Sequence, residues 1–254
     1  MLKLKHSRNQ KQVIDLAREK NYFRAGFAVA VGVDEAGRGP LAGPVVAAAV
    51  AIAPPFFIRD FAGLIGVVRD SKKMSAAARE SAYEKIANHP KIICAAAAVG
   101  DKTIDRINIL QASKLAMERA VGKTVKMMRG RIPDDKIICL IDGNFSIKIA
   151  HSQESVIGGD DKVFSIAAAS IVAKVRRDRL MARMDKIYPG YGFARHKGYG
   201  TGQHLAAIEK HGLCPIHRRS FSPIARAAAR RGQNFKGLTL VNARVRPLKS
   251  RHNE

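Results

Sequence analysis

The sequence predicts an α/β fold with a mixed central β-sheet, flanked by helices and followed by a helical C-terminal part. Short apolar runs, bounded by glycine, proline or charge, alternate with longer helix-forming stretches along most of the chain. Two further helical patterns with their own start and stop residues follow near the C-terminal end. The 254 residues are 46% hydrophobic and 26% charged, which is typical of one large globular domain or two small ones.

The strand predictions begin with two apolar runs, Phe27–Val33 and Pro44–Ala53. A third run covers Lys91–Val99, and a fourth covers Ile137–Ile141. Each is short and rich in alanine or β-branched residues, which favours strands buried on one or both faces. The short run Ser155–Ile157 is a candidate fifth strand.

Five stretches with a helical pattern separate or follow these strands: Met74–Asn88, Ile104–Met128, Phe164–Ile187, Gly202–His211 and Pro223–Arg231. Ser75, Thr201 and Ser222 are the candidate N-caps of three of them. The helix over residues 164–187 contains SIAAASIVAK near its start, and such small side chains allow a helix to approach a sheet closely. We therefore expect this helix to pack directly on the strands.

By composition and pattern, the chain divides into four parts. Residues 1–24 form a basic N-terminal segment, and 25–200 form the α/β domain. Residues 201–231 form the C-terminal helical part. Residues 232–254 form a basic tail, for which solvated, disordered chain is one interpretation.

The charge of the chain indicates a polyanionic partner. Lys and Arg number 45 against 21 Asp and Glu, a net charge of +24. Residues 25–216 alone carry +10, so the core is basic without its ends. A protein this basic attracts polyanions, with nucleic acid the leading candidate and an anionic membrane surface the second.

Several classes of protein are excluded. No apolar run reaches the length of about 18 residues that a membrane helix needs, and MLKLKHSRNQ contains no apolar core of a secretion signal. Cys94, Cys139 and Cys214 form no CxxC pair, which argues against a disulfide framework and a zinc–cysteine site. We expect a cytoplasmic protein with no membrane association. Because no oligomerisation signal stands out, we also expect a monomer.

Acidic residues are scarce, yet three predicted strands carry them at their ends. Asp34 and Glu35 follow the first apolar run, and Asp142 follows IICLI. Asp160 follows the short run SVIGG, with Asp161 beside it. If these strands are neighbours, the carboxylates repel one another until a proton, a basic side chain or a divalent cation relieves the repulsion.

A cluster of carboxylates without His or Cys suits Mg²⁺ or Mn²⁺ rather than Zn²⁺. In a basic protein it indicates phosphodiester chemistry with two metal ions about 4 Å apart, one activating water and the other stabilising the leaving oxygen. The alternative is that Asp142-Gly-Asn forms a turn and Asp160 caps the following helix. Three acidic strand ends together favour the metal site.

One geometric condition applies to Asp34 and Glu35, because adjacent side chains of a regular strand point to opposite faces. Both reach one metal pair only if the strand ends or bulges between them, which the following AGRGP permits. Gly37 and Gly39 allow the backbone to approach a ligand, and Arg38 offers a fork for phosphate. A plain glycine-rich turn would show the same pattern.

Residues 33–45, VDEAGRGPLAGPV, closely resemble the signature of ribonuclease HII. The resemblance covers about Val31–Ala228. Its further motifs occur in order: DSKKMS at 70–75, IDRINIL at 104–110, IDGN at 141–144, GD at 159–160, IAAASIVAKV at 166–175 with RD at 177–178, YGF at 191–193, HKGY at 196–199 and HRRSF at 217–221. So many motifs in one order do not arise by chance.

The resemblance implies that residues 25–200 are an RNase H-like catalytic domain. It implies an endonuclease that cleaves RNA in RNA–DNA hybrids and incises 5′ of single ribonucleotides in duplex DNA, leaving a 3′-hydroxyl and a 5′-phosphate, as ribonucleotide excision repair requires. By motif, the catalytic metal ligands would be Asp34, Glu35, Asp142 and Asp160, holding two Mg²⁺ or Mn²⁺ ions.

The resemblance also implies substrate-binding residues. Gly37, Arg38 and Gly39 would contact the 2′-hydroxyl and adjacent backbone, since that hydroxyl is what distinguishes a ribonucleotide. Tyr199 would stack on the next sugar and test the RNA-to-DNA junction, although from the sequence alone a half-buried packing role is favoured. Four lysines are candidate phosphate contacts, each of which could equally be a solvated surface charge: Lys72, Lys73, Lys174 and Lys197.

Two rival functions stay open. Ribonuclease HIII differs by a Gly-Lys-Gly loop and a long N-terminal extension, and Arg38 and the short segment before the first strand favour HII. A non-catalytic binder of nucleic acid would show steep salt dependence and no metal-dependent cutting. The acidic strand ends argue against it, because negative charge hinders binding to nucleic acid. The sequence does not indicate the physiological metal, the role of the tails or whether a replication clamp is a partner.

Overall fold

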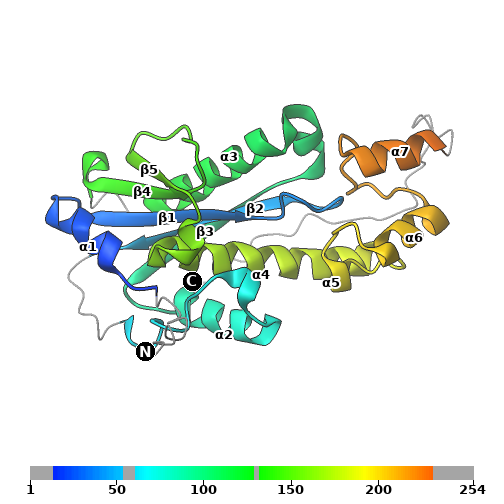
Figure 1. Cartoon of the computed structure of the whole chain (residues 1–254). Coiled ribbons are helices and arrows are strands. Elements are labelled where there is room, and N and C mark those ends of the chain that lie inside the picture. Colours follow the sequence, from blue (N-terminus) through cyan, green and yellow to red (C-terminus); the bar gives the residue numbers. More distant parts are fainter. Residues whose placement is uncertain (1–13, 54–60, 129–131, 231–254) are drawn as a thin grey trace, which may run out of the picture.

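A five-stranded sheet forms the centre of the computed structural model, which describes residues 14–53, 61–128 and 132–230. The strand order is β3-β2-β1-β4-β5 (Figure 1). The strands are β1 Val29–Ala36, β2 Val45–Ile52, β3 Ile92–Val99, β4 Ile137–Asp142 and β5 Ser152–Val156. β1, β2 and β3 pair antiparallel, whereas β1, β4 and β5 pair parallel, so the predicted mixed sheet is confirmed.

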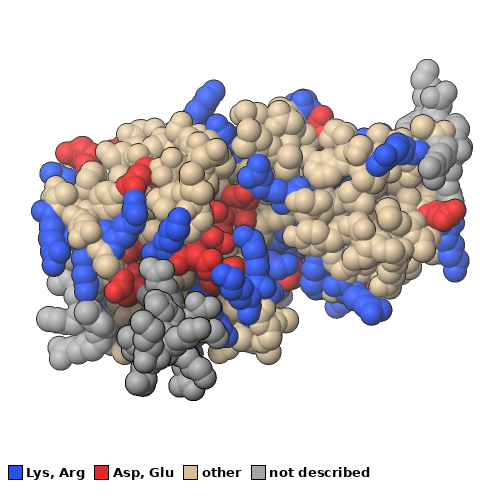
Figure 2. Space-filling model, viewed as in Figure 1, with Lys and Arg blue, Asp and Glu red and all other residues tan. Residues whose placement is uncertain are grey.

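Helices cover both faces of this sheet and extend beyond one end of it (Figure 1). They are α1 Ala17–Arg24, α2 Ala76–Ala87, α3 Asp101–Met127, α4 Phe164–Ile187, α5 Phe193–His196, α6 Gly202–His211 and α7 Ser222–Arg230. α3 packs on one face and α4 on the other, with α2 outside α4. The last two helices, α6 and α7, form the predicted C-terminal helical part. Figure 2 shows acidic side chains gathered in the middle of one face of the molecule, with Lys and Arg side chains around them.

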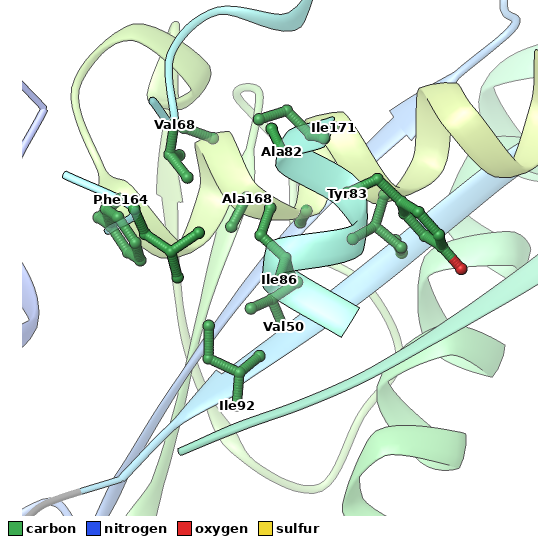
Figure 3. Close-up of a cluster of buried hydrophobic side chains, with 14 of the residues drawn as sticks. Val50, Val68, Ala82, Tyr83, Ile86, Ile92, Phe164, Ala168 and Ile171 are labelled. Carbon is green, nitrogen blue, oxygen red and sulfur yellow. The ribbon is translucent and has the colours of Figure 1, made fainter. Parts of the chain in front are cut away.

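Two hydrophobic clusters hold these layers together. Between the sheet and α4, Val50 packs with Phe164, Ala168 and Ile171, and Ile86 of α2 completes the layer (Figure 3). On the opposite face, alternate residues of β1 and β4 pack against α3. Because burying one such large aliphatic or aromatic side chain contributes about 1.5–3 kcal/mol, these layers fix the position of the strands.

The alternation of side chains along β1 requires a glycine at its centre. Val31 and Val33 face α3, so Gly32 faces α4. A Cβ atom on Gly32 would lie 2.1 Å from the main-chain carbon of Ser165 and 2.3 Å from the nitrogen of Ile166. The first turn of α4 therefore rests on the backbone of β1, as its small residues predicted.

Most predicted elements are confirmed, with changes at their ends. α4 and α6 have the predicted bounds, and the caps at Ser75 and Thr201 accept main-chain N–H groups at 3.2 and 3.3 Å. β5 begins at Ser152, three residues earlier than predicted. α3 begins at Asp101 rather than Ile104. Asn108, at φ 63° and ψ 167°, interrupts it, and the Asn108 side chain accepts the Gln111 N–H and caps the second part.

The sequence interpretation missed α1, which lies in the segment predicted only as basic. Its eight residues, AREKNYFR, show no apolar stripe, so the pattern gives no helix signal. A tertiary contact anchors it: the buried Glu19 carboxylate accepts the Ser165 N–H at 2.7 Å, at the start of α4. The predicted tail, 232–254, and Arg231 lie outside the described residues. In the described ranges, no helix has the length and apolarity that a membrane span requires.

We predict that Gly32→Ala destabilises the protein because the added methyl group must push α4 away from β1. Overpacking of this kind costs about 1–3 kcal/mol, and each kcal/mol lowers Tm by about 2–4 °C in a chain of this size. Thermal unfolding followed by circular dichroism measures the change. The control is Gly122→Ala in α3, where a Cβ meets nothing within 4 Å, so stability should rise by up to about 1 kcal/mol. Equal Tm values for the two variants would contradict the prediction.

Candidate active site

Asp34 and Asp142 lie side by side at the ends of two parallel strands. β1 and β4 are in register up to the pair Val33 and Ile141, and each aspartate is the next residue. Alternation places Asp34 on the same face as Gly32, and Asp142 on the same face as Leu140, which is the face that α4 covers. The parallel pairing thus brings together two of the predicted acids.

Glu35 reaches the same edge from the next position of β1. The strand stays paired with β2 through Ala36, so it neither ends nor bulges between Asp34 and Glu35, and the predicted condition is not met. Glu35 leaves the strand on the opposite face from Asp34 and would have to turn toward it to share an ion. Glu35 Oε1 accepts Arg38 Nη1 at 3.3 Å, whereas Oε2 is buried without a hydrogen-bond partner. The charge of Asp142 is one of the causes that raise the pKa of both Asp34 and Glu35.

Asp160 joins these acids from the turn Gly159–Asp161, just before α4. The Gly159 N–H donates to Asp142 Oδ1 at 2.7 Å and holds the turn against the end of β4. Asp160 is buried, and its Oδ2 accepts Lys72 Nζ at 3.0 Å. It does not cap α4, whose N-cap is Val163, so the capping alternative is wrong. Asp161 is exposed and binds Lys73 at 2.9 Å.

The convergence of the acids changes their protonation. Burial, and then the charges of Glu35 and Asp142, raise the pKa of Asp34 well above its usual value. Burial also raises the pKa of Glu35 and of Asp142, and Asp160 adds to the effect on Asp142. In each of these three carboxylates, burial and neighbouring negative charge therefore raise the pKa by more than the hydrogen bonds lower it.

These residues fit a divalent cation. All four donors are carboxylates, the ligands that Mg²⁺ and Mn²⁺ prefer, and the orphaned Glu35 Oε2 has no other partner. Within the described ranges, no three His, Cys, Asp or Glu side chains yet surround a common point as a metal cage. Binding would therefore require the carboxylates to turn toward the ion.

The four lysines predicted to contact phosphate fall into two groups, of which only one lies at the acidic residues. Lys72 lies at the acids through Asp160, and Lys73 lies beside them through Asp161 and Asp70. Lys174, in contrast, pairs with Asp178 at 2.8 Å, one turn further along α4, and Lys197 donates to the Ala194 carbonyl at 2.5 Å.

Two fully buried arginines, Arg177 and Arg218, hold the glycine loop after β1. Arg218 donates to the carbonyls of Gly37, Arg38 and Gly43 at 2.6, 2.8 and 2.9 Å. Arg177 donates to the carbonyls of Pro44 and Ala42 at 3.0 and 3.3 Å. The carbonyls of the loop thus point inward to fixed positive charge.

Both arginines are held close to Gly37. Gly37 has φ +98°, and a Cβ there would lie 2.0 Å from Arg177 Nε, so the position requires glycine. Burial, and next the charge of Arg177, lower the pKa of Arg218 to about 9. Sequence reasoning included both arginines in motifs but gave them no role. The burial of Arg177 could have been predicted from the sequence, because Arg177 lies four residues from each of the apolar Ala173 and Met181 and so shares their buried face of the helix.

Tyr199 lies beside this loop with 44% of its surface exposed. The guanidinium of Arg177 is 5.9 Å from the ring centroid. A Cβ on Gly39 would be 3.8 Å from Tyr199 Cε1. The ring is therefore half-buried against the loop, as the packing interpretation expected, while its exposed part leaves it accessible for stacking.

Comparison with known proteins decides the family. The family model described as Ribonuclease HII matches residues 31–224. The chain belongs to the ribonuclease HII family. It is 47% identical over 221 residues to the ribonuclease HII of Acetivibrio thermocellus, covering 87% of this chain and 80% of that protein. It is 50% identical over 200 residues to ribonuclease HII 1 of Methylibium petroleiphilum, covering 78% and 92%.

Solved structures show the same fold. Ribonuclease H2 from Pyrococcus horikoshii superposes with a TM-score of 0.61 at 24% identity, over 81% of this chain and all of that one. The Bst-RNase HIII complex with Mn²⁺ gives a TM-score of 0.63 at 21% identity, over 82% and 71%. Membership in the ribonuclease HII family makes the protein a ribonuclease H, an endonuclease acting on RNA–DNA hybrids. The non-catalytic alternative is thereby wrong.

We predict that Asp34→Asn stabilises the metal-free protein near neutral pH. Because the folded-state pKa of Asp34 is raised, the folded state binds more protons, so this group costs stability as the pH rises above its ordinary pKa, and the cost is complete once the pH passes the folded-state pKa. The asparagine removes this penalty, so Tm in EDTA should rise by about 2–4 °C for each kcal/mol relieved. The gain should shrink as the pH falls and wild-type Asp34 takes up its proton.

The control for this prediction is Asp161→Asn, which removes a half-exposed carboxylate already paired with Lys73. An exposed pair is worth at most about 1 kcal/mol, so this variant should not gain stability. A Tm of Asp34→Asn at or below that of the wild type in EDTA would show that Asp34 is not under electrostatic strain.

Proposed function

We propose that this ribonuclease H depends on divalent metal and incises 5′ of single ribonucleotides in duplex DNA, besides cleaving the RNA of hybrids. The products would be a 3′-hydroxyl and a 5′-phosphate. One observation supports the proposal: Asp34, Glu35 and Asp142 lie at one edge of the sheet and the turn with Asp160 is bonded to Asp142, beside a glycine loop and an exposed tyrosine. The first group suits phosphodiester hydrolysis, and the second suits recognition of a sugar.

Asp34, Glu35, Asp142 and Asp160 would hold two Mg²⁺ or Mn²⁺ ions. When bound, such ions supply an activated water and stabilise the leaving oxygen. The sheet keeps Asp34 and Asp142 in register, and the 2.7 Å bond from Gly159 keeps Asp160 beside them. The chain therefore supplies neighbouring carboxylates that would turn toward a cation, and the cation would relieve their mutual repulsion.

The chain's other residues would orient the substrate. The positive charge of the two buried arginines lies on the inner side of the loop that carries Gly37 and Gly39. This charge would favour a nucleic-acid phosphate backbone on the outer side of the loop. Lys72 and Lys73 lie at the rim of the acidic cluster and would contact phosphate. Tyr199 would stack on the nucleotide after the ribose.

The nature of the partner follows from family and charge. The family acts on nucleic acid, and the chain carries a net +24. A solved complex of RNase HII with PCNA is known from Archaeoglobus fulgidus, similar in fold at a TM-score of 0.57 and 23% identity. The monomeric state and the cytoplasmic location stay predictions from the sequence.

We predict that Asp142→Asn abolishes cleavage while hybrid binding is retained. The substitution removes a ligand from the centre of the acidic cluster, so kcat should fall about 100-fold or more, about 3 kcal/mol of transition-state stabilisation. Binding should persist because one negative charge fewer faces the nucleic acid. Cleavage of a labelled duplex with one ribonucleotide, in Mg²⁺, Mn²⁺ and EDTA, and a binding titration measure the two effects.

Asp161→Asn serves as the matched control, because it neutralises the adjacent exposed carboxylate and should cleave at close to the wild-type rate. Wild-type cleavage by Asp142→Asn, or full activity of the wild type in EDTA, would refute the proposed site.

We predict that Tyr199→Ala lowers the preference for a single embedded ribonucleotide over a long hybrid. Stacking on an aromatic ring is worth about 1–3 kcal/mol, so the ratio of kcat/KM on the two substrates should fall roughly tenfold or more. Tyr199→Phe keeps the ring and should retain the ratio. A uniform loss on both substrates would argue against recognition of the junction, and a wild-type preference for long hybrids would favour activity of the ribonuclease HIII type.

A further inference from the structure

Three buried histidines support the segment that carries Tyr199. His196, His204 and His217 are 8%, 0% and 1% exposed. The rings of His196 and His204 stack with centroids 4.5 Å apart, and those of His204 and His217 stack at 5.2 Å. The proposed catalytic machinery uses none of them.

Hydrogen-bond chemistry determines which nitrogen of His204 carries its proton. His204 Nδ1 lies 2.9 Å from the carbonyl oxygen of Tyr199. A carbonyl only accepts, so Nδ1 is the donor and carries the hydrogen. In the neutral ring Nε2 is then a bare acceptor, and it lies 3.1 Å from His217 Nε2.

His217 supplies the matching donor. Its Nδ1 accepts the Cys214 N–H at 2.9 Å, which leaves the hydrogen on Nε2, facing His204. Nδ1 also lies 3.2 Å from the Cys214 carbonyl, but a neutral ring nitrogen that accepts the Cys214 N–H carries no hydrogen to donate there. Hydrogen bonds therefore run in one direction, from Cys214 through His217 and His204 to the Tyr199 carbonyl.

This direction needs both rings to be neutral. Burial, with smaller contributions from neighbouring imidazoles, lowers the pKa of each of His204 and His217 to about 4. His196 is outside the chain of bonds, since it donates to the Tyr191 carbonyl at 2.7 Å and accepts the Gly198 N–H at 3.2 Å.

The His217 end of this hydrogen-bond network is attached to the glycine loop. His217 pairs with Ala42 in a β-bridge, and the Gly43 N–H donates to the Ile216 carbonyl at 2.9 Å. On the Tyr199 side, the Leu41 N–H donates to the Gly198 carbonyl at 2.8 Å. Two independent connections thus fix Tyr199 relative to the loop: the main-chain bond from Leu41 to Gly198, and the histidine network that joins the Tyr199 carbonyl to the strand pairing at Ala42.

We propose that His204 and His217 are positioning residues that hold Tyr199 beside the Gly37–Gly39 loop and thereby set the selectivity for the RNA-to-DNA junction. The inference rests on the proposed role of Tyr199. An exposed ring discriminates between substrates only if its backbone is fixed, and the Tyr199 carbonyl is the group that this network holds.

The test compares His204→Ala with His204→Asn. Alanine removes the donor to Tyr199, whereas the side-chain amide of asparagine can place an N–H where Nδ1–H was. Loss of one such bond should lower the ratio of kcat/KM on single-ribonucleotide and long-hybrid substrates by about threefold to tenfold. Asparagine should restore most of the ratio. His211→Ala, at the exposed end of α6, is the control and should match the wild type.

A second measurement needs no substrate. Long-range ¹⁵N–¹H correlation spectra of the full chain should show His204 protonated at Nδ1 and His217 at Nε2. The opposite tautomer in either ring would overturn the network, whatever the activity of the variants.

The kinetic outcomes separate the inference from the function on which it rests. An unchanged ratio for His204→Ala, or equal loss in the alanine and asparagine variants, overturns the positioning role while Tyr199 keeps its own. An unchanged ratio for Tyr199→Ala would instead refute the role of Tyr199, and with it the inference.

Discussion

The pairing of β1 with β4 is the constraint on which the rest of the site depends. Because the two strands are parallel and in register up to Val33 and Ile141, the residues that follow this pair, Asp34 and Asp142, lie next to each other near the same edge. The sheet is stabilised by apolar burial on both faces, which holds two carboxylates together against their repulsion. The raised pKa of each shows that the fold opposes their ionisation, as is typical where binding or catalysis has shaped a site.

α4 connects this acidic edge with the elements proposed to bind substrate. Its first turn rests on the backbone of β1 at Gly32, next to the turn that supplies Asp160. About three turns before its end, the same helix places Arg177 under the glycine loop and Tyr199. A rigid helix packed along the sheet therefore sets the distance between the proposed chemistry and the proposed recognition of the sugar.

The C-terminal part has an unusually polar interior. Arg218 and the histidines are buried there, and main-chain carbonyls and neighbouring rings satisfy them. Such interiors are costly unless fully hydrogen-bonded, and when satisfied they specify one arrangement of the backbone. The elements that they fix are the glycine loop and the Tyr199 segment. The polar interior therefore supports, from the inside, the surface that is proposed to bind substrate.

The sequence by itself determined the fold class, the bounds of α4 and α6, and the four acids as a candidate group, because strand ends and helix caps are local signals. It could not show α1, whose helix depends on the contact of Glu19 with α4. Nor could it give a role to Arg177, Arg218 or the histidines, whose partners are main-chain carbonyls and rings distant in sequence. Those roles exist only once the chain has folded, since no local pattern records which carbonyl a buried donor will meet.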